Sequence, residues 1–455
     1  MKLSHDDIVN SLESRWPENR VGPSLDRIAA IMDLLGNPQS AQPVVQITGT
    51  NGKGSTAIMV DALLRAAGLR TGRFTSPHLE DISERIVIDG SPITPDVFDE
   101  VWDEIGPLVE MVDERSIGGI ECTFFEVMTA LAYAAFADAP VDVAVMEVGM
   151  GGRWDATSVA DASVAVVAPI GLDHMQYLGD TIAQIADEKS GIIKADAVAV
   201  LAAQQPSAAE VLVRRCLDVG ATMVREGEDF GLIDRQLAAG GQVIRVITGD
   251  GPVGELFLPL HGEHMARNAA LAVAAAEAML GRPLSPDVIQ AGFDAVQAPA
   301  RLELIDVDPP VVLDTAHNPQ AVAATLAAAE EAFQFEPLIG VLGMMGDKQV
   351  PQVLELLEPV VATLVVTQAV GSPRVMPADE LADLASDVFG HERVIQADDA
   401  MSALDQARNL AKASGDQAGV LVLGSVYLAG ELRSDVLTQR RREQALMDDG
   451  WGDGS

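Results

Sequence analysis

The sequence is short of basic residues. Its 455 residues include 30 lysines and arginines against 68 aspartates and glutamates, which gives a formal net charge of -38 at pH 7. Non-specific binding to nucleic acid and attraction to an anionic membrane surface both depend on a basic field. We therefore expect neither nucleic acid nor a membrane among the partners of this chain.

Cysteines and long apolar runs are scarce as well. Cys122 and Cys216 are the only cysteines and have no metal-like spacing, so neither a disulfide framework nor a zinc site is indicated. Residues 1–20 contain no apolar run typical of a signal peptide. The longest apolar stretch, 269–280, is interrupted by Glu277 and is too short to span a bilayer. These absences favour a cytoplasmic protein.

What the sequence does contain is typical of a folded α/β protein. Apolar residues make up 48% of the chain and charged residues 22%, which is not the composition of a disordered acidic chain. Apolar runs of strand length alternate with Ala/Leu-rich helical stretches, the pattern of parallel sheets covered by helices. Residues 297–300 separate two such series, which predicts domains 1–297 and 298–455.

Individual elements can be assigned within both series. The expected strands are 44–48, 141–148, 163–168, 242–248, 311–314, 338–342, 363–367 and 420–424. The expected helices are 53–68, 320–333, 378–388, 400–413 and one that starts at Thr123, where the sequence TFFE has the spacing of a capping box.

A glycine-rich segment, GTNGKGST at 49–56, follows the first strand and opens a helix. Glycines let backbone N–H groups close around an anion, the helix N-terminus adds partial positive charge, and Lys53 adds a point charge. The segment therefore predicts a triphosphate site. The general P-loop pattern is not satisfied, because position 47 is Ile and Gly54 follows the lysine. The alternative is a glycine-rich turn with a solvated lysine.

An acid and an imidazole stand at the ends of two further strands. Glu147 ends one apolar run, and His174 follows the next run after a short turn. Ligand sites of open parallel sheets lie at the carboxyl ends of strands, and oxygen ligands beside a phosphate loop favour magnesium held partly by nucleotide. The alternatives are an ion pair of Glu147 with Arg153 and a turn histidine at 174. Taken alone, Lys189 reads as a solvated helix lysine.

Six ordered segments together resemble the folylpolyglutamate synthase and dihydrofolate synthase family of the Mur ligase superfamily. They are TGTNGKGST (48–56), TSPHLEDISERI (75–86), EVGMGGRWDAT (147–157), DHMQYLGDTIAQIADEKSGI (173–192), DTAHNP (314–319) and GSVYLAGE (424–431). The resemblance implies an α/β fold with an N-terminal Mur ligase central domain of the P-loop type and a C-terminal Rossmann-like domain. It places the active site in the cleft between them.

The resemblance also implies a reaction. Family members join L-glutamate to a pteroate or folate carboxylate with ATP and Mg²⁺, through an acyl phosphate. Because the 123–126 and 154–156 segments could supply a dihydropteroate pocket, we expect a bifunctional dihydrofolate synthase/folylpolyglutamate synthase, and a monomer. The alternatives are a monofunctional folylpolyglutamate synthase, another Mur-type amino-acid ligase, and a nucleotide-driven switch.

Site residues follow from motif positions. The resemblance assigns ATP contacts to Thr50, Asn51, Gly52, Lys53, Gly54, Ser55, Asn268, Arg301 and Asp314. It assigns the metal to Ser76, Glu147, His174 and Lys189, the last as a carbamate, and a catalytic role to Lys53, Lys189 and His317. It assigns pterin, folate or glutamate contacts to Thr123, Phe124, Phe125, Glu126, Trp154, Asp155, Ala156 and Ser425. Without the resemblance, Phe124 or Phe125 on a helix face would more often belong to the core.

Three positions depart from the family pattern. Ser158 stands where Asn is usual, Met265 replaces a common Gln, and Ala300 precedes Arg301 where Gly is usual. None of these changes removes a proposed metal ligand or phosphate contact.

Overall fold

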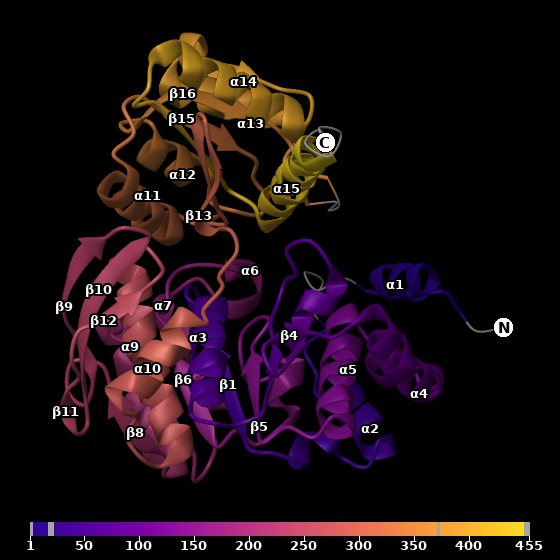
Figure 1. Cartoon of the computed structure of the whole chain (residues 1–455). Coiled ribbons are helices and arrows are strands. Elements are labelled where there is room, and N and C mark those ends of the chain that lie inside the picture. Colours follow the sequence, from indigo (N-terminus) through magenta and orange to yellow (C-terminus); the bar gives the residue numbers. More distant parts are fainter. Residues whose placement is uncertain (1–2, 17–21, 371–373, 450–455) are drawn as a thin grey trace, which may run out of the picture. The chain divides into compact units, whose positions relative to one another are not determined.

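The computed structural model describes residues 3–16, 22–370 and 374–449. The chain forms two compact units (Figure 1). The first unit comprises residues 1–259 and 264–297, and the second comprises residues 260–263 and 298–455. Each unit has its own large sheet and its own helices. No helix in the described part of the chain is long and apolar enough to cross a membrane.

An eight-stranded sheet organises the first unit. The strand order is β4-β3-β2-β5-β1-β6-β7-β8, and all neighbours from β2 to β8 run parallel. The strands are β1 (Val44–Thr48), β2 (Thr71–Phe74), β3 (Ile86–Ile88), β4 (Ser91–Pro92), β5 (Val143–Glu147), β6 (Val164–Val167), β7 (Val198–Leu201) and β8 (Thr222–Arg225). The predictions of strands at 44–48, 141–148 and 163–168 are confirmed, the last two with shorter ends. Because β1 lies between β5 and β6, the carboxyl ends of these three strands are neighbours.

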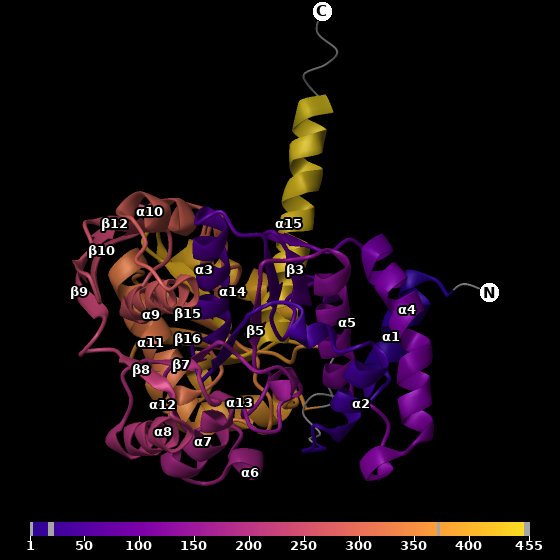
Figure 2. The same ribbon diagram turned by 90° about the horizontal axis from the view of Figure 1, so that it is seen from below.

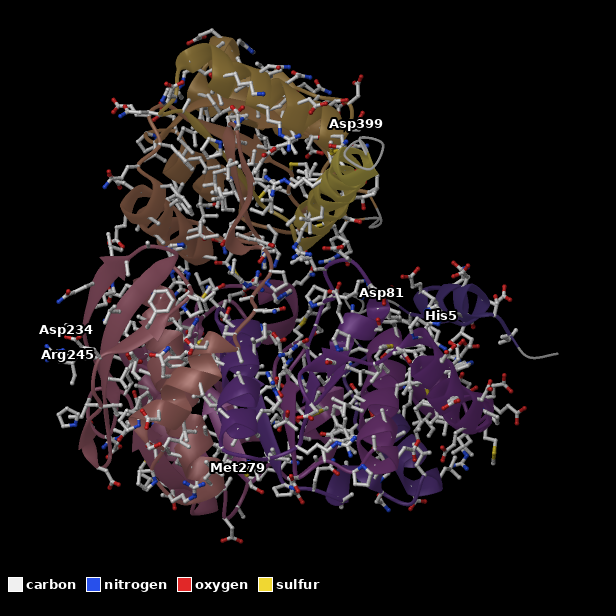
Figure 3. The ribbon with its side chains drawn as sticks, in the orientation of Figure 1. His5, Asp81, Asp234, Arg245, Met279 and Asp399 are labelled. Atoms are coloured by element: carbon white, nitrogen blue, oxygen red, sulfur yellow. The ribbon has the colours of Figure 1, made fainter. Side chains whose placement is uncertain are left out.

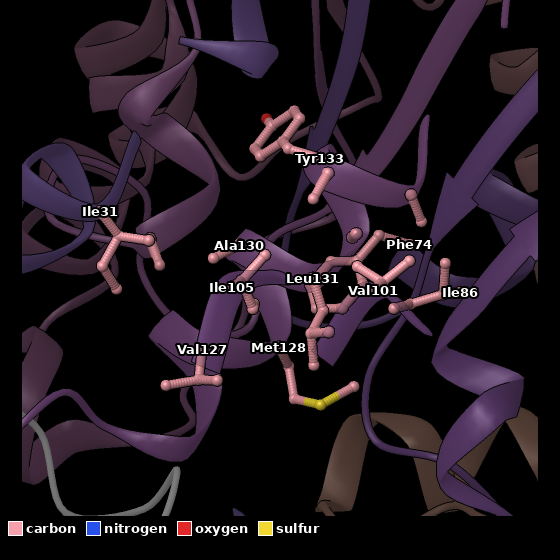
Figure 4. Packing of buried hydrophobic residues seen from close by; sticks show 14 of the residues in the cluster. Ile31, Phe74, Ile86, Val101, Ile105, Val127, Met128, Ala130, Leu131 and Tyr133 are labelled. Carbon is pink, nitrogen blue, oxygen red and sulfur yellow. The ribbon is translucent and has the colours of Figure 1, made fainter. Parts of the chain in front are cut away.

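Ten α-helices are described in the first unit: α1 (His5–Glu13), α2 (Asp26–Leu34), α3 (Lys53–Ala66), α4 (Pro95–Glu114), α5 (Phe124–Asp138), α6 (Met175–Leu178), α7 (Ile182–Lys189), α8 (Pro206–Val219), α9 (Glu263–Leu280) and α10 (Pro286–Asp294). Of α9, only the first residue, Glu263, is assigned to the second unit. Figure 2 shows α1, α2, α4 and α5 gathered on one side. Their apolar side chains form a core with those of β2 and β3 (Figure 4), in which Ile31, Phe74, Ile105 and Leu131 have no exposed surface. Burying one such side chain contributes about 1.5–3 kcal/mol.

Helix α3 carries the phosphate loop at its start and is anchored to the sheet further along. The Asp61 carboxylate is completely buried and accepts hydrogen bonds from the Thr71 hydroxyl, from Arg65 Nε at 3.4 Å and from Arg73 Nη1 at 3.3 Å. Since Thr71 and Arg73 belong to β2, these bonds fix α3 against the sheet.

A smaller antiparallel sheet also belongs to the first unit. It consists of β9 (Gly231–Ala238), β10 (Gly241–Thr248), β11 (Gly251–Pro252) and β12 (Leu256–Leu258), with β10 pairing all three others. The prediction of a strand at 242–248 is confirmed. Asp234 and Arg245 form a cross-strand ion pair on its exposed side (Figure 3).

The second unit is built around a six-stranded sheet in the order β13-β14-β18-β15-β16-β17. Only β13 is antiparallel to its neighbour. The elements are β13 (Arg301–Val307), β14 (Pro310–Asp314), α11 (Pro319–Phe333), β15 (Leu338–Leu342), α12 (Val350–Leu357), β16 (Val361–Val366), α13 (Ala378–Phe389), β17 (Val394–Gln396), α14 (Ala400–Ser414), β18 (Gly419–Leu423) and α15 (Val426–Asp449). The four strands and three helices predicted in this series are confirmed to within two residues at each end.

Candidate active site

The phosphate loop lies between β1 and α3. Gly52 has a φ of +83°, a left-handed conformation that disfavours side chains, and a Cβ there would lie 2.7 Å from Asn268 Oδ1. The Thr50 N–H donates to the carbonyl oxygen of Pro169 at 2.9 Å. The N-cap residue of α3 is Gly52, which has no side chain to cap the first N–H groups of the helix. These groups therefore offer the anion-binding end of a 14-residue helix.

Side chains at the start of α3 add to this anion site. Lys53 is half-buried, and its Nζ lies 3.4 Å from the Thr50 carbonyl oxygen. Ser55 is buried, and the buried Thr56 Oγ1 has no hydrogen-bond partner among the described residues. A cation and a hydroxyl beside exposed helix N–H groups are the donors that a triphosphate requires.

Glu147 lies beside this loop at the end of β5. Only 4% of its surface is exposed, and its Oε2 accepts from the Ser76 N–H at 3.2 Å. A Cβ added at Gly54 would come within 3.4 Å of the same oxygen, so the glycine leaves room for the carboxylate. The Arg153 guanidinium donates to the carbonyl and carboxylate oxygens of Asp187, so an ion pair with Glu147 is not needed to account for this arginine.

Lys189, at the end of α7, is buried rather than solvated. It is 3% exposed, and its Nζ donates to the Gly49 carbonyl oxygen at 2.8 Å. The reading of this residue as a solvated helix lysine is therefore wrong. Burial, and then the positive charge of Lys53, lower the pKa of Lys189 from 10.5 to about 7. A large share of the amine is thus unprotonated near neutral pH, which is the nucleophilic form.

This lowered pKa predicts a pH dependence of stability. Between about pH 7 and 10.5 the unfolded amine binds a proton that the folded amine does not. The free energy of unfolding should therefore rise with pH, by up to about 1.4 kcal/mol per pH unit, relative to Lys189→Met. Urea unfolding of both proteins in CO₂-free buffer at pH 7, 8 and 9 measures the difference. A difference that does not change with pH would contradict the burial of a free amine.

His174 and Asp173 follow β6. The backbone of His174 is left-handed at a φ of +51°, and its N–H donates to Asp173 Oδ1 at 2.9 Å. Its ring Nε2 lies 3.9 Å from Asp173 Oδ2. The negative charge of Asp173 also acts on Lys189, opposing the fall of its pKa. Asp173, after β6, and Lys189, at the end of α7, therefore belong to one electrostatic group.

The 123–126 segment has a clear structural role. The predicted capping box is confirmed, because the Glu126 N–H donates to Thr123 Oγ1 at 3.2 Å and the Thr123 N–H donates to Glu126 Oε2 at 2.8 Å. Phe124 is 6% exposed and belongs to the core, with the Arg85 guanidinium 5.0 Å from its ring centroid. Phe125 is partly buried and contacts Phe74 with 5.6 Å between ring centroids. A pterin contact of these residues stays a prediction.

Glu126 also forms a buried ion pair, which sequence reasoning missed. Arg27 Nε on α2 donates to its Oε2 at 3.0 Å, and both side chains are almost fully buried. In Arg27→Met we expect a loss of roughly 3–5 kcal/mol in the free energy of unfolding, because an uncompensated carboxylate stays buried. Urea unfolding followed by tryptophan fluorescence tests this, since Trp16, Trp102 and Trp154 lie in the first unit.

The matched control is Arg214→Met. Arg214 pairs with Glu210 at 2.7 Å, but both side chains are about two-thirds exposed, and such surface pairs contribute about 0–1 kcal/mol. Equal losses of unfolding free energy in the two variants would show that the buried Arg27–Glu126 pair contributes no more to stability than a surface pair.

Trp154, Asp155 and Ala156 follow a glycine-rich turn after β5. Trp154 is half-buried, and Ala156 is buried. Asp155 is 3% exposed and accepts from the N–H groups of Met150 and Thr157, both at 3.0 Å. Burial raises the pKa of Asp155 to about 6 despite these hydrogen bonds. Its carboxylate therefore holds the turn together.

The predicted residues of the second unit occupy the ends of β13, β14 and β18. Arg301 pairs with Asp314 in the register of β13 and β14. Asp314 is buried and accepts from the Leu302 and Ala316 N–H groups and the Thr325 hydroxyl, at 2.8–3.0 Å. His317 Nδ1 lies 2.9 Å from the Thr315 carbonyl oxygen.

Ser425 belongs to the loop that follows β18. It is 3% exposed and its Oγ accepts from the Tyr427 N–H at 3.1 Å. The Gly424 N–H donates to the Ala316 carbonyl oxygen at 2.8 Å. This bond joins the His317 loop to the Ser425 loop, so the structure brings these two predicted residues to one edge of the sheet.

The first unit also contains a cavity of about 210 Å³ beside the phosphate loop, lined by Pro169, Ala202, Ala203, Glu226, Arg267, Asn268 and Leu271. Of these residues, only Asn268 was expected at the site. Glu226 follows β8, and its position after a strand could have indicated it, but the sequence signal of that short, partly exposed strand was too weak for us to assign it.

Two domain models match this chain. Residues 103–276 match the Mur ligase middle domain, and residues 300–426 match the glutamate ligase domain of Mur ligases. The sheet, the phosphate loop and these matches together define an ATP-dependent ligase of the Mur type.

Relatives narrow this class. The dihydrofolate synthase/folylpolyglutamate synthase of Mycobacterium tuberculosis is 48% identical over 94% of this chain and 93% of the relative. The folylpolyglutamate synthase of Lacticaseibacillus casei is 34% identical over 90% and 94%. The solved structure of the M. tuberculosis folylpolyglutamate synthase complexed with ADP superposes with a TM-score of 0.91, at 46% identity over 95% and 98% of the two chains. The chain belongs to the dihydrofolate synthase/folylpolyglutamate synthase family.

Proposed function

We propose that this chain joins L-glutamate to dihydropteroate and to folates at the expense of ATP, as a bifunctional dihydrofolate synthase/folylpolyglutamate synthase. The observation that carries the proposal is the phosphate loop with a buried carboxylate, Glu147, directly beside Gly54. The names of the relatives and a solved complex of a folylpolyglutamate synthase with AMPPCP and folate, at 31% identity and a TM-score of 0.83, support it.

The residues around Glu147 fit a divalent metal ion. Mg²⁺ prefers oxygen ligands and usually takes only one or two carboxylates from the protein. Glu147 supplies a buried carboxylate, and Ser76, whose N–H it accepts, would add a hydroxyl. We propose His174 as a further ligand through a ring nitrogen, although no group of three His, Cys, Asp or Glu residues among those described could hold a metal by itself. When bound, Mg²⁺ would neutralise phosphate charge during transfer.

The reaction requires a carboxylate to approach the γ-phosphate of ATP, although both groups are anions and repel each other. Cationic groups of the protein would reduce this repulsion. Lys53 and the N–H groups at the start of α3 would stabilise charge on the phosphate oxygens, at little reorganisation cost because folding has already fixed them. The substrate carboxylate then displaces ADP to form an acyl phosphate. The amine of glutamate attacks that carbonyl carbon, phosphate leaves, and the amine loses a proton.

We assign Lys189 a carbamate. The ammonium group would first lose a proton, and the neutral amine would then add to CO₂ and lose a second proton, so that a cation becomes an anion beside Lys53. The pKa near 7 and the burial of the side chain support this step. Such an anion would join Ser76, Glu147 and His174 as a possible metal ligand.

The two units would have different tasks. We propose that the first unit, with Thr50, Asn51, Gly52, Lys53, Gly54, Ser55 and Asn268, holds ATP, and that its 123–126 and 154–156 segments face the pterin. The second unit would contribute Arg301 and Asp314 to ATP, and His317 and Ser425 to glutamate. A monomer located in the cytoplasm stays a prediction.

One assay tests the function. The purified protein is incubated with ATP, Mg²⁺, L-glutamate and one acceptor: dihydropteroate, tetrahydrofolate or a UDP-sugar peptide. Mass spectrometry then determines how many glutamates have been added to each acceptor. We expect glutamate added to both pteridines. Addition to tetrahydrofolate alone indicates a monofunctional folylpolyglutamate synthase, and addition to the UDP-sugar peptide another Mur-type ligase. ATP hydrolysis without any acceptor or glutamate would support a nucleotide-driven switch.

A further inference from the structure

We infer that Glu226 selects the adenine base by accepting a hydrogen bond from its 6-amino group, in the cavity beside the phosphate loop. The inference rests on the proposed use of ATP and adds to it a residue that determines which nucleotide is used. It is carried by the position of the cavity, by its few polar lining residues among apolar ones, and by the contacts of the Glu226 carboxylate.

The cavity adjoins the phosphate loop at two points. The Pro169 carbonyl oxygen accepts the Thr50 N–H at 2.9 Å, and the Asn268 amide stands against Gly52. Pro169 and Asn268 both line the cavity. The cavity is therefore placed to receive the base of a nucleotide whose phosphates occupy the loop.

The cavity suits one flat heterocycle. Its volume of about 210 Å³ is below the roughly 300 Å³ at which pockets begin to bury whole drug-sized ligands. Ala202, Ala203 and Leu271 supply apolar walls, as the faces of a purine require. The polar side chains of the lining are those of Glu226, Arg267 and Asn268, so side-chain hydrogen bonds to a base would come from these three residues.

Glu226 is held in a fixed position. Its side chain is only 6% exposed, its Oε2 accepts the Ala203 N–H at 2.7 Å, and its Oε1 accepts from Arg267 Nη1 at 2.9 Å. A carboxylate oxygen can accept more than one hydrogen bond, so both oxygens keep accepting capacity after these contacts. The two contacts prevent the side chain from turning away from the cavity it lines.

An acceptor held in this way distinguishes purines. Adenine carries an amino group at position 6, which is a hydrogen-bond donor. Guanine carries a carbonyl oxygen there, which is an acceptor and would be repelled by the carboxylate. A base without the 6-amino group would leave the carboxylate without one of its partners. Buried sites made for a donor reject analogues that lack it.

The test compares ATP with purine riboside 5′-triphosphate, which lacks only the 6-amino group, and with GTP. Calorimetry of the full chain without folate and glutamate measures binding alone. We expect the wild-type protein to bind ATP at least about tenfold more tightly than either analogue. In Glu226→Ala the ratio of ATP to purine riboside triphosphate should fall to about two or less, and in Glu226→Gln, which keeps an oxygen for the Ala203 N–H, to an intermediate value.

Glu228→Gln is the matched control. Glu228 lies two residues further along, with a side chain 57% exposed and paired with Arg225, and its variant should retain the wild-type ratio. An unchanged ratio in both Glu226 variants, or a wild-type protein that binds purine riboside triphosphate as tightly as ATP, overturns the inference while ATP use stands. Failure of the wild-type protein to bind any of these nucleotides overturns the proposed function together with it.

Discussion

Glu147→Gln should reduce Mg²⁺-dependent ligase turnover by roughly a hundred- to a thousandfold, the effect of removing one fixed group that stabilises transition-state charge. Glutamine has the shape of glutamate and keeps an oxygen that can accept the Ser76 N–H, which lies 3.2 Å from Oε2. What it loses is the negative charge beside the phosphate loop. The measurement is kcat from ADP release at saturating ATP, with Mg²⁺ titrated into each protein.

Two comparisons make this result specific. Glu210→Gln removes a carboxylate that is 71% exposed on α8, and it should retain wild-type turnover. The melting temperature of Glu147→Gln should stay close to that of the wild type, because the exchange relieves a buried charge. Turnover within a few-fold of wild type at every Mg²⁺ concentration would rule out Glu147 as a metal ligand.

Lys189→Ala should lose turnover by a comparable factor, and short carboxylic acids should restore part of it. Truncation leaves a cavity next to the Gly49 carbonyl oxygen, where the Nζ is now bound at 2.8 Å. A small carboxylate can enter that space and supply the anion that a carbamate would have supplied. Rates are measured with increasing acetate or propionate at constant ionic strength.

Lys53→Met is the appropriate control for rescue. It removes the neighbouring cation rather than the proposed anion, so added carboxylate should not help it. Full activity of unrescued Lys189→Ala would refute the carbamate. Equal rescue of both variants would show that the acids act elsewhere.

The sequence predicted those parts of the molecule that depend on neighbouring residues. A few consecutive residues determine each of the correctly predicted features: the strand 44–48, the start of α3 at Lys53, and the capping box of Thr123 and Glu126. Such segments carry their own hydrogen-bonding and burial patterns, so periodicity and turn chemistry reveal them.

Contacts between distant segments could not be predicted in this way. The Arg27–Glu126 pair joins residues 99 positions apart, and the Lys189–Gly49 hydrogen bond joins residues 140 apart. Nothing in the local sequence of α7 distinguishes a buried lysine at its end from a solvated one. Only the resemblance of the motif indicated a role for Lys189, and the structure supplies the physical reason for its unusual environment.

Two of the departures from the family pattern can be related to their surroundings in the structure. Ala300 has a φ of +53°, a conformation that glycine adopts without strain, which explains why glycine is usual there. Ser158 Oγ accepts from Gln46 Nε2 at 2.8 Å and donates to the Gly152 carbonyl oxygen, so a hydroxyl meets the polar groups around it. Met265 is buried, and nothing in the structure explains its replacement of glutamine.

The anchoring of α3 has a thermodynamic consequence for the nucleotide. Asp61, eight residues after Lys53, ties the helix to β2 through Thr71 and Arg73. Because the loop leads directly into this anchored helix, less of its conformational entropy is left to be lost when ATP binds. Ordering a loop on binding would subtract from affinity, so part of the nucleotide affinity is set by a buried carboxylate that never meets the nucleotide.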